Sequence, residues 1–108
     1  MRQVEEKDFG EFREVCRIDN CMIKLANGKA IFGYDVRFCK HLDEQHHEYN
    51  ALIIVQRTRY CGYHSTRTKI LKAYVCTNEE GNAVYKRIKE TAFRTKRGCK
   101  MYNITHIV

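Results

Sequence analysis

The segment 56–69 combines guanidinium, aromatic and hydroxyl side chains and contains no Asp or Glu. Its basic and aromatic residues are Arg57, Arg59, Tyr60, Tyr63, Arg67 and Lys69. Guanidinium groups form forked hydrogen bonds with phosphates, hydroxyl groups donate to phosphate oxygens, and aromatic rings stack on exposed bases. The segment therefore predicts contact with nucleic acid. The alternative is a solvated loop whose tyrosines pack against a sheet.

Positive charge is concentrated in the second half of the chain. The net charge is +7, but residues 51–108 alone carry +9, with twelve Lys and Arg against three acids. Residues 1–14 carry −2, and residues 15–50 are neutral. This asymmetry favours a polyanionic partner, either nucleic acid or a nucleoprotein assembly. An acidic groove on a partner protein would explain the same charge, as would a basic surface that is only solvated.

A basic helix is predicted downstream of this segment. Thr77 and Glu80 have the spacing of a capping box, and Gly98 is a typical helix stop, so a helix is expected between them. On a helical wheel the side opposite the apolar residues carries Lys86, Arg87, Arg94 and Arg97. Together with Lys72 and the segment 56–69, these residues are expected to form one nucleic-acid-binding surface.

Four thiol and imidazole side chains suggest a zinc site. Cys61 and His64 flank a glycine with the C-x-x-H spacing of half a tetrahedral site, and Cys39 with one of His41, His46 or His47 would supply the other half, His41 being the first choice. The spacing matches no zinc-finger pattern. The alternative is buried thiols and ordinary surface histidines, with no cofactor at all.

Catalytic groups are present, but their spacing assigns no reaction. A small metal-independent ribonuclease of toxin type would use His, Lys and Arg for proton transfer and phosphate stabilisation. No spacing identifies a general acid and a general base, and Asp35 is the only strand-placed acid in the middle of the chain. Nothing orients Cys61 and His64 for nucleophilic catalysis. We therefore expect a non-enzymatic binding module, with the ribonuclease and a protein-interaction inhibitor as alternatives.

Composition places the chain among soluble globular proteins. The 108 residues are 44% hydrophobic and 31% charged, enough for one domain with its own core. No apolar run reaches the length of a membrane helix, and residues 1–7 lack the apolar stretch of a signal peptide. The expectation is a cytoplasmic protein whose six cysteines are thiols, of the kind used as accessory regulators by phages and mobile elements.

The first half of the chain is expected to contain a helix and a hairpin. Apolar spacing favours a helix over 4–17, although 12–18 also fits an alternating strand. The runs 21–25 and 30–38 flank Asn27 and Gly28, a dipeptide typical of tight hairpin turns with two positive φ angles. Gly33 is expected to mark a bulge. Residues 39–50 are predicted to form a polar loop.

The second half is expected to contain three further strands. Residues 51–55 form an apolar run typical of a central strand, and 69–76 alternate as a half-buried strand. The connection 58–68 is predicted to be a long loop, and 101–108 a terminal strand. The fold class predicted for 1–108 is α+β: a single domain with a mainly antiparallel sheet of about five strands, an N-terminal helix and a longer helix before the last strand.

Overall fold

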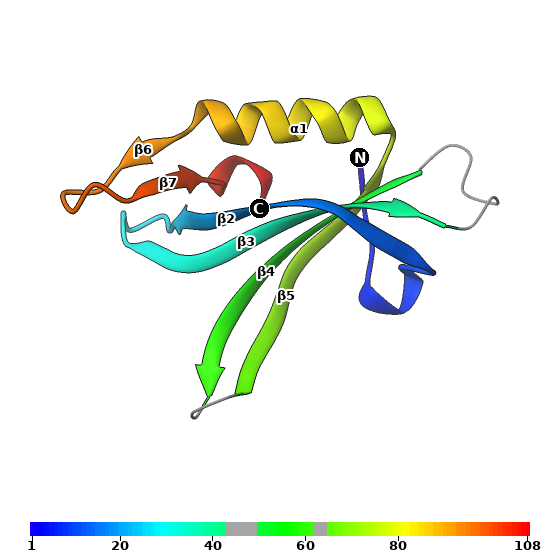
Figure 1. Cartoon of the computed structure of the whole chain (residues 1–108), viewed down its shortest axis with the longest axis horizontal. Coiled ribbons are helices and arrows are strands. Elements are labelled where there is room, and N and C mark those ends of the chain that lie inside the picture. Colours follow the sequence, from blue (N-terminus) through cyan, green and yellow to red (C-terminus); the bar gives the residue numbers. More distant parts are fainter. Residues whose placement is uncertain (43–49, 62–64) are drawn as a thin grey trace.

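One strongly twisted sheet forms the body of the protein (Figure 1). The computed structural model describes residues 1–42, 50–61 and 65–108, with the backbone alone at 59–61 and 65–66. Within these residues seven strands are hydrogen-bonded in the order β1-β5-β4-β3-β2-β7-β6. Their bounds are β1 Arg2–Gln3, β2 Phe12–Lys24, β3 Ala30–His41, β4 Ala51–Cys61, β5 Ser65–Cys76, β6 Phe93–Arg94 and β7 Lys100–Asn103. Neighbouring strands are antiparallel, except that β2 and β7 are parallel.

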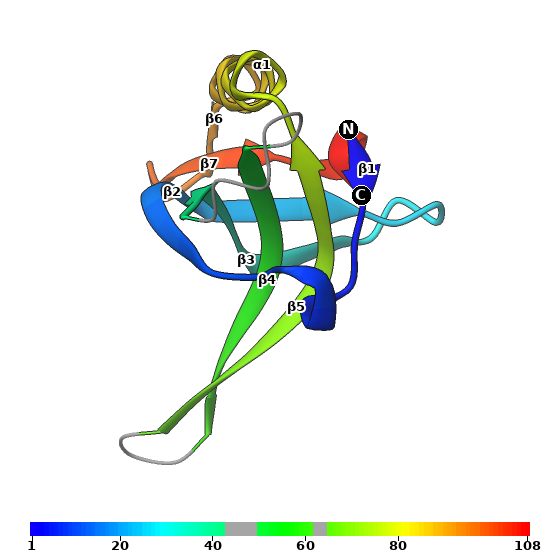
Figure 2. The ribbon, with the colours of Figure 1, turned by 90° about the vertical axis from the view of Figure 1, so that its right-hand side faces the viewer.

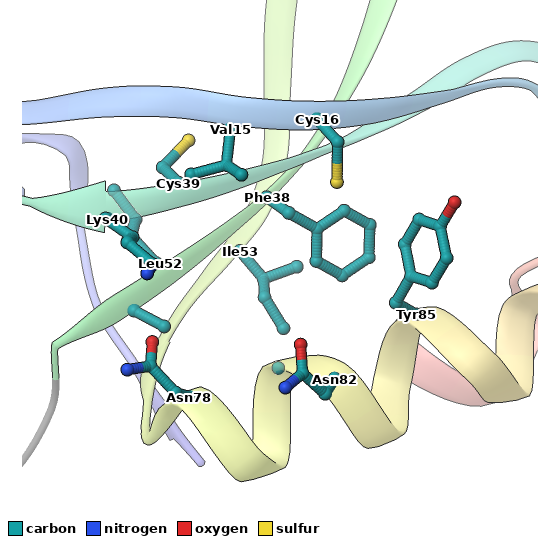
Figure 3. A pocket seen from close by; sticks show the side chains of 12 residues that line it. Val15, Cys16, Phe38, Cys39, Lys40, Leu52, Ile53, Asn78, Asn82 and Tyr85 are labelled. Carbon is teal, nitrogen blue, oxygen red and sulfur yellow. The ribbon is translucent and has the colours of Figure 1, made fainter.

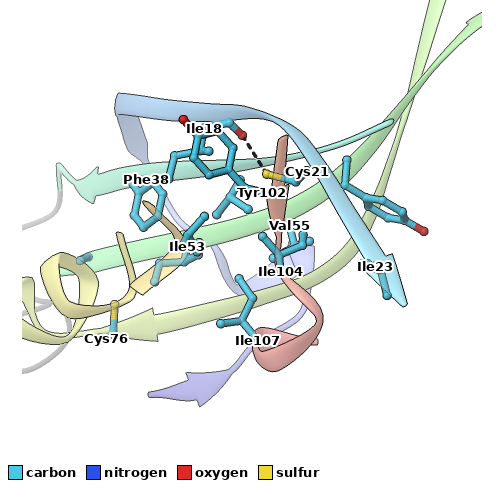
Figure 4. Close-up of a cluster of buried hydrophobic side chains, with 14 residues drawn as sticks. Ile18, Cys21, Ile23, Phe38, Ile53, Val55, Cys76, Tyr102, Ile104 and Ile107 are labelled. Atoms are coloured by element: carbon cyan, nitrogen blue, oxygen red, sulfur yellow. Dashed lines mark hydrogen bonds between the residues drawn. The ribbon is translucent and has the colours of Figure 1, made fainter. Parts of the chain in front are cut away.

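A single α-helix covers one face of the sheet. Helix α1 (Asn78–Glu90) lies across the top in Figure 1 and is seen end-on in Figure 2. The short 3-10 helix η2 (Thr105–Ile107) packs on the same face. Figure 4 shows the main core beneath them, in which Ile53 and Val55 of β4 pack with Ile88 of α1 and with Ile104 and Ile107 at the end of the chain. No helix in the described residues is long and apolar enough to cross a membrane.

The opposite face of the sheet has a second, smaller core. Leu52 and Ile54 of β4 and Val75 of β5 are buried there against Phe9. The segment before β2 covers this face and includes the 3-10 helix η1 (Glu6–Asp8). Since both faces of β4 are covered, residues 51–55 are all buried. The prediction of a central strand at 51–55 is therefore confirmed.

The helix predicted over 4–17 is wrong, and the strand alternative for 12–18 is correct. Strand β2 runs from Phe12 with register shifts between Glu14 and Cys16 and between Ile18 and Cys21. Each shift adds an unpaired residue and reverses the alternation of faces. The apolar residues of the segment therefore lose the two-residue period and acquire a spacing that resembles a helix.

The hairpin predicted around Asn27 and Gly28 is confirmed, but its turn differs. Strands β2 and β3 pair up to Lys24 and Ala30, and the Gly28 N–H donates to the Leu25 carbonyl oxygen at 2.9 Å. Of these two turn residues, Gly28 alone has a positive φ, at 84°. The turn is thus longer than the two-residue form. The bulge predicted at Gly33 is present as a register shift beside a φ of 88°.

One predicted loop is largely strand in its described residues, and the other begins within a strand. Strand β3 extends to His41 at the start of the predicted loop 39–50, and residues 43–49 lie outside the described part of the chain. Strands β4 and β5 continue through most of the predicted connection 58–68, leaving 62–64 outside the description. The result is a long two-stranded hairpin that protrudes from the sheet, away from α1 (Figures 1 and 2).

The last part of the chain also departs from the prediction. The capping box of Thr77 and Glu80 is present, but α1 ends at Glu90 instead of continuing to Gly98. The predicted terminal strand is shorter, because β7 ends at Asn103 and η2 follows. The α+β class is plausible for this architecture. The described residues hold seven strands instead of about five, and one α-helix that lies before the last two strands.

Candidate nucleic-acid interface

The protruding hairpin carries a row of basic residues on one side. Facing pairs in its register are Arg57 with Lys69 and Arg59 with Arg67. Facing residues of an antiparallel pair share a side, and so do residues two apart along a strand. Positions 57, 59, 67 and 69 therefore lie on one side, and position 60, facing Thr66, lies on the other. We call the hairpin from positions 57 and 69 outward the basic arm.

Basic residues face one another across the two strands of the basic arm. Like charges directly opposite one another destabilise a strand pair. Arg67 and Lys69 are exposed, and no ion pair in the described part of the chain involves either of them. Arg57 is half-buried, with its guanidinium carbon 5.6 Å from the centre of the Tyr34 ring. The facing like charges lower the stability of the strand pair, and the contact of Arg57 with the Tyr34 ring offsets part of that loss.

A bulge brings Lys72 to the same side of β5 as the basic arm. Val55 faces Lys72 while Gln56 faces Ile70, so Leu71 has no facing residue and its side chain is 41% exposed. Without this extra residue, Lys69 and Lys72 would lie on opposite faces. With it, Lys72 lies on the α1 side, beside Tyr74.

Lys72 lines a crevice between β5, α1 and η2. The crevice has a volume of about 370 Å³, and its other basic lining residues are Arg87 and His106. Burial and the charge of Arg87 lower the pKa of His106 below its usual value. No local pattern points to His106, because it meets Arg87 and Lys72 through contacts across 19 and 34 positions of the chain.

The basic residues predicted for the helix do not form one surface. Lys86 and Arg87 are exposed on α1. Arg94 lies in β6, where its Nη1 donates to the Gly98 carbonyl oxygen at 2.9 Å, and Arg97 is in the following turn. Strand β6 is at one edge of the sheet, five positions from β5 in the strand order. Of the predicted helix residues, Arg87 is the one that lines the crevice with Lys72.

On the face opposite α1, basic side chains are paired with acids. Glu14 Oε1 accepts hydrogen bonds from Arg17 Nη2 at 2.9 Å and from Arg37 Nε at 2.8 Å, and Asp35 Oδ2 accepts from Arg17 Nη1 at 3.2 Å. We call these four residues the charged cluster. Burial opposes ionisation of Glu14, but its hydrogen bonds with Arg37 and Arg17 outweigh burial and lower its pKa. Burial raises the pKa of Asp35, whose Oδ1 has no hydrogen-bond partner among the described atoms.

Of the residues predicted to bind zinc, the described backbone places Cys39 and Cys61 far apart. Cys39 faces Leu52 near the start of β4, whereas Cys61 ends that strand, about 30 Å further along. Burial raises the pKa of the Cys39 thiol to about 11, and His41 Nε2 lies 3.0 Å from the Phe9 carbonyl oxygen. His64 and Tyr63 lie outside the described residues. The backbone gives no support to a site that combines Cys39 with Cys61, and no group of three potential metal ligands occurs in the described part of the chain.

A small apolar groove separates α1 from β2 and β3 (Figure 3). Phe38 and Tyr85 stack edge to face there, with ring centres 5.3 Å apart, and Cys16 lies beside them. Burial raises the pKa of Cys16, which makes its thiol a weak nucleophile at neutral pH. The groove holds about 90 Å³, below the range of about 300–1,000 Å³ typical of small-molecule sites. It does not indicate cysteine catalysis.

The described residues form a single domain with one α-helix and a mostly sheet core, from which the basic arm protrudes. Comparisons with models of protein families, with curated proteins and with solved structures find no match.

Proposed function

We propose that the protein is a non-enzymatic module that binds nucleic acid along the basic arm. The observation that supports this most strongly is the register of the arm, in which Arg57 faces Lys69 and Arg59 faces Arg67. Four cations are thereby lined up along the side of one ribbon, and residues 49–78 contain no Asp or Glu to neutralise them. A polyphosphate backbone supplies negative charge at a similarly regular spacing.

The shape of the arm fits the same ligand. Beyond the Tyr34–Arg57 pair, no third strand is bonded to the described part of the arm, so both edges of the ribbon are free of strand partners there. A two-stranded ribbon can lie along a phosphate backbone or in the major groove of duplex DNA. Contacts between phosphates and Arg or Lys provide affinity without reading sequence. We therefore infer binding dominated by phosphate contacts, with accessory or regulatory roles in a nucleoprotein assembly.

The test compares two triple variants that lose the same charge in different places. Arg57→Ala/Arg67→Ala/Lys69→Ala alters the arm, and Lys96→Ala/Arg97→Ala/Lys100→Ala alters the distant end of the sheet near β6 and β7. Fluorescence anisotropy would follow binding to duplex DNA, single-stranded DNA and structured RNA over a range of salt concentrations. Each lost phosphate contact should reduce the slope of log affinity against log salt by about one, so the arm variant should lose about three units. The control should retain the wild-type slope.

Three outcomes would contradict the proposal. Equal effects of the two triple variants would mean that overall charge, and not the arm, governs binding. Cleavage of the RNA during the titration would favour the ribonuclease alternative. A complex with a protein that survives nuclease treatment and is lost in the arm variant would favour the inhibitor alternative. Thermal unfolding of each variant checks that the fold is intact.

A further inference from the structure

The crevice beside the basic arm has the composition of a phosphate site. Lys72 projects from β5, Arg87 from α1 and His106 from η2, so three separate elements place a cation or an ionisable imidazole around one space. Val84 and Ile107 line the crevice as well, which gives it apolar walls next to the basic groups. Its volume of about 370 Å³ lies within the range of small-molecule sites.

Hydrogen bonds hold the walls of the crevice in place. The Tyr74 hydroxyl on β5 donates to the Ile107 carbonyl oxygen at 2.7 Å and so ties η2 to the sheet. The carboxylate of Glu80, on the same helix as Arg87, is engaged by the amino group of Met1 at 2.6 Å. None of the ion pairs in the described residues involves Lys72, Arg87 or His106. The charges of Lys72 and Arg87 are therefore not neutralised by any ion pair of the described residues.

The position of the crevice connects it to the arm. Lys72 follows Lys69 by three residues on β5, a separation of about 10 Å along the strand. The bulge at Leu71 places both lysines on the same face. A strand of nucleic acid that lies along the arm can thus direct one of its ends toward the crevice.

We propose that the crevice binds the terminal phosphate of a nucleic-acid strand, a phosphate monoester. This inference rests on the proposed nucleic-acid binding. A terminal phosphate carries more negative charge than an internal phosphodiester, about −1.5 to −2 at neutral pH. Arg87 can bind two of its oxygens in a forked geometry, Lys72 supplies a point charge, and His106 donates a hydrogen bond when it is protonated. The apolar walls formed by Val84 and Ile107 would contact the last sugar or base.

The experiment compares oligonucleotides of one sequence that carry a 5′-phosphate, a 3′-phosphate or hydroxyl groups at both ends. The wild-type protein is expected to bind one of the phosphorylated forms about tenfold more tightly than the hydroxyl form. Lys72→Ala/Arg87→Ala should lose this preference and still bind the hydroxyl form. The arm variant Arg57→Ala/Arg67→Ala/Lys69→Ala should bind all three forms weakly but keep their ratio. Equal binding of all three forms by the wild-type protein would overturn the proposal.

A second measurement separates failure of the crevice from failure of the arm. Inorganic phosphate and adenosine monophosphate are titrated into the protein while the NMR signals of the His106 ring are recorded. Saturable shifts in the wild-type protein that vanish in Lys72→Ala/Arg87→Ala would establish the phosphate site even if no oligonucleotide binds. No shift with either ligand would exclude the site, whatever the arm does.

Discussion

Each face of the sheet has a hollow, and the two hollows are similar in size. They differ in whether their basic residues are paired with acids. On the face opposite α1, a hollow of about 410 Å³ is lined by Arg17 and Arg37, both of which are bonded to Glu14. On the α1 face, the crevice of about 370 Å³ is lined by Lys72 and Arg87, and no ion pair of the described residues involves them. The hollow and the crevice therefore differ in the pairing of their basic residues and not in the number of those residues.

The difference lies in what each set of charges stabilises. In the charged cluster the acids and arginines come from β2 and β3, so their pairing strengthens the contact between two strands of the fold. In the basic arm and the crevice, no acid pairs with the described basic side chains, and the contact of Arg57 with the Tyr34 ring is the one stabilising interaction described for them. Basic residues that a protein keeps at a cost to its own stability are the better candidates for binding an anionic ligand.

The largest effect is expected when acids are introduced opposite the basic residues of the arm, so that the arm contains ion pairs like those of the charged cluster. Arg67→Glu with Lys69→Glu would place an acid opposite Arg59 and opposite Arg57. Two cross-strand ion pairs should raise the free energy of unfolding by about 0.4–2 kcal/mol in total. Nucleic-acid affinity should fall at least about a hundredfold, because four units of positive charge are removed from the arm. Urea denaturation and anisotropy would measure the two effects.

The matched control for this reversal is Lys96→Glu with Arg97→Glu, which changes the net charge equally. It should reduce nucleic-acid affinity far less. If the arm reversal weakens folding or leaves binding intact, the distinction between paired structural charges and unpaired binding charges does not hold for this protein.

A smaller effect is expected from breaking the charged cluster. Glu14→Ala removes the shared acceptor of Arg17 and Arg37 and should lower the free energy of unfolding by about 1–2 kcal/mol, since the site is only partly shielded from water. Nucleic-acid affinity should change less than twofold. Urea denaturation compared with Glu11→Ala, an exposed acid in the same segment, would measure the effect. Equal stability of the two variants would show that the cluster is not structural.

The smallest effect concerns the protonation of His106. Burial and the Arg87 charge lower its pKa below 6.5, so protonation is harder in the folded state than in the unfolded chain. Its contribution to stability is therefore complete above about pH 6.5 and is lost as the pH falls through the folded pKa. Arg87→Ala should raise the pKa of His106 by a fraction of a unit, whereas Arg94→Ala should not. An NMR titration in which both variants match the wild-type protein would contradict the placement of Arg87 beside His106.

The sequence was most informative where the signals are local. The capping box of Thr77 and Glu80 and the turn near Gly28 depend on residues within four positions of each other, and both were found. The end of α1 was misjudged because the chain turns back at Thr91 to pair β7 with β2, which is a contact between distant segments. Strand β2 was predicted only in pieces, as 21–25 and as the alternative for 12–18, because its bulges interrupt the alternation that identifies a strand.

The candidate site was predictable in composition but not in arrangement. The basic composition of the segment 56–69 was evident from the sequence. Its two strands were not predicted, because a strand that is polar on both sides lacks the alternation of apolar and polar residues that identifies a strand. The charged cluster left no signal, since Asp35 and Arg17 are 18 positions apart. The sequence predicts one basic surface from Lys72 to Arg97. In the structure Lys72 lies in β5, near one end of the strand order, and Arg97 follows β6 at the other end. Sequence patterns do not indicate the strand order.

Because no third strand is bonded to the outer part of the arm, insertions and deletions can change the length of the arm during evolution. Beyond position 57 the described arm bonds to no third strand, so its length is independent of both cores. Adding or removing two residues from each strand would alter its reach by about 6.6 Å and leave every remaining side chain on its original side. Reach can therefore vary among descendants of this chain in discrete steps while the body stays the same.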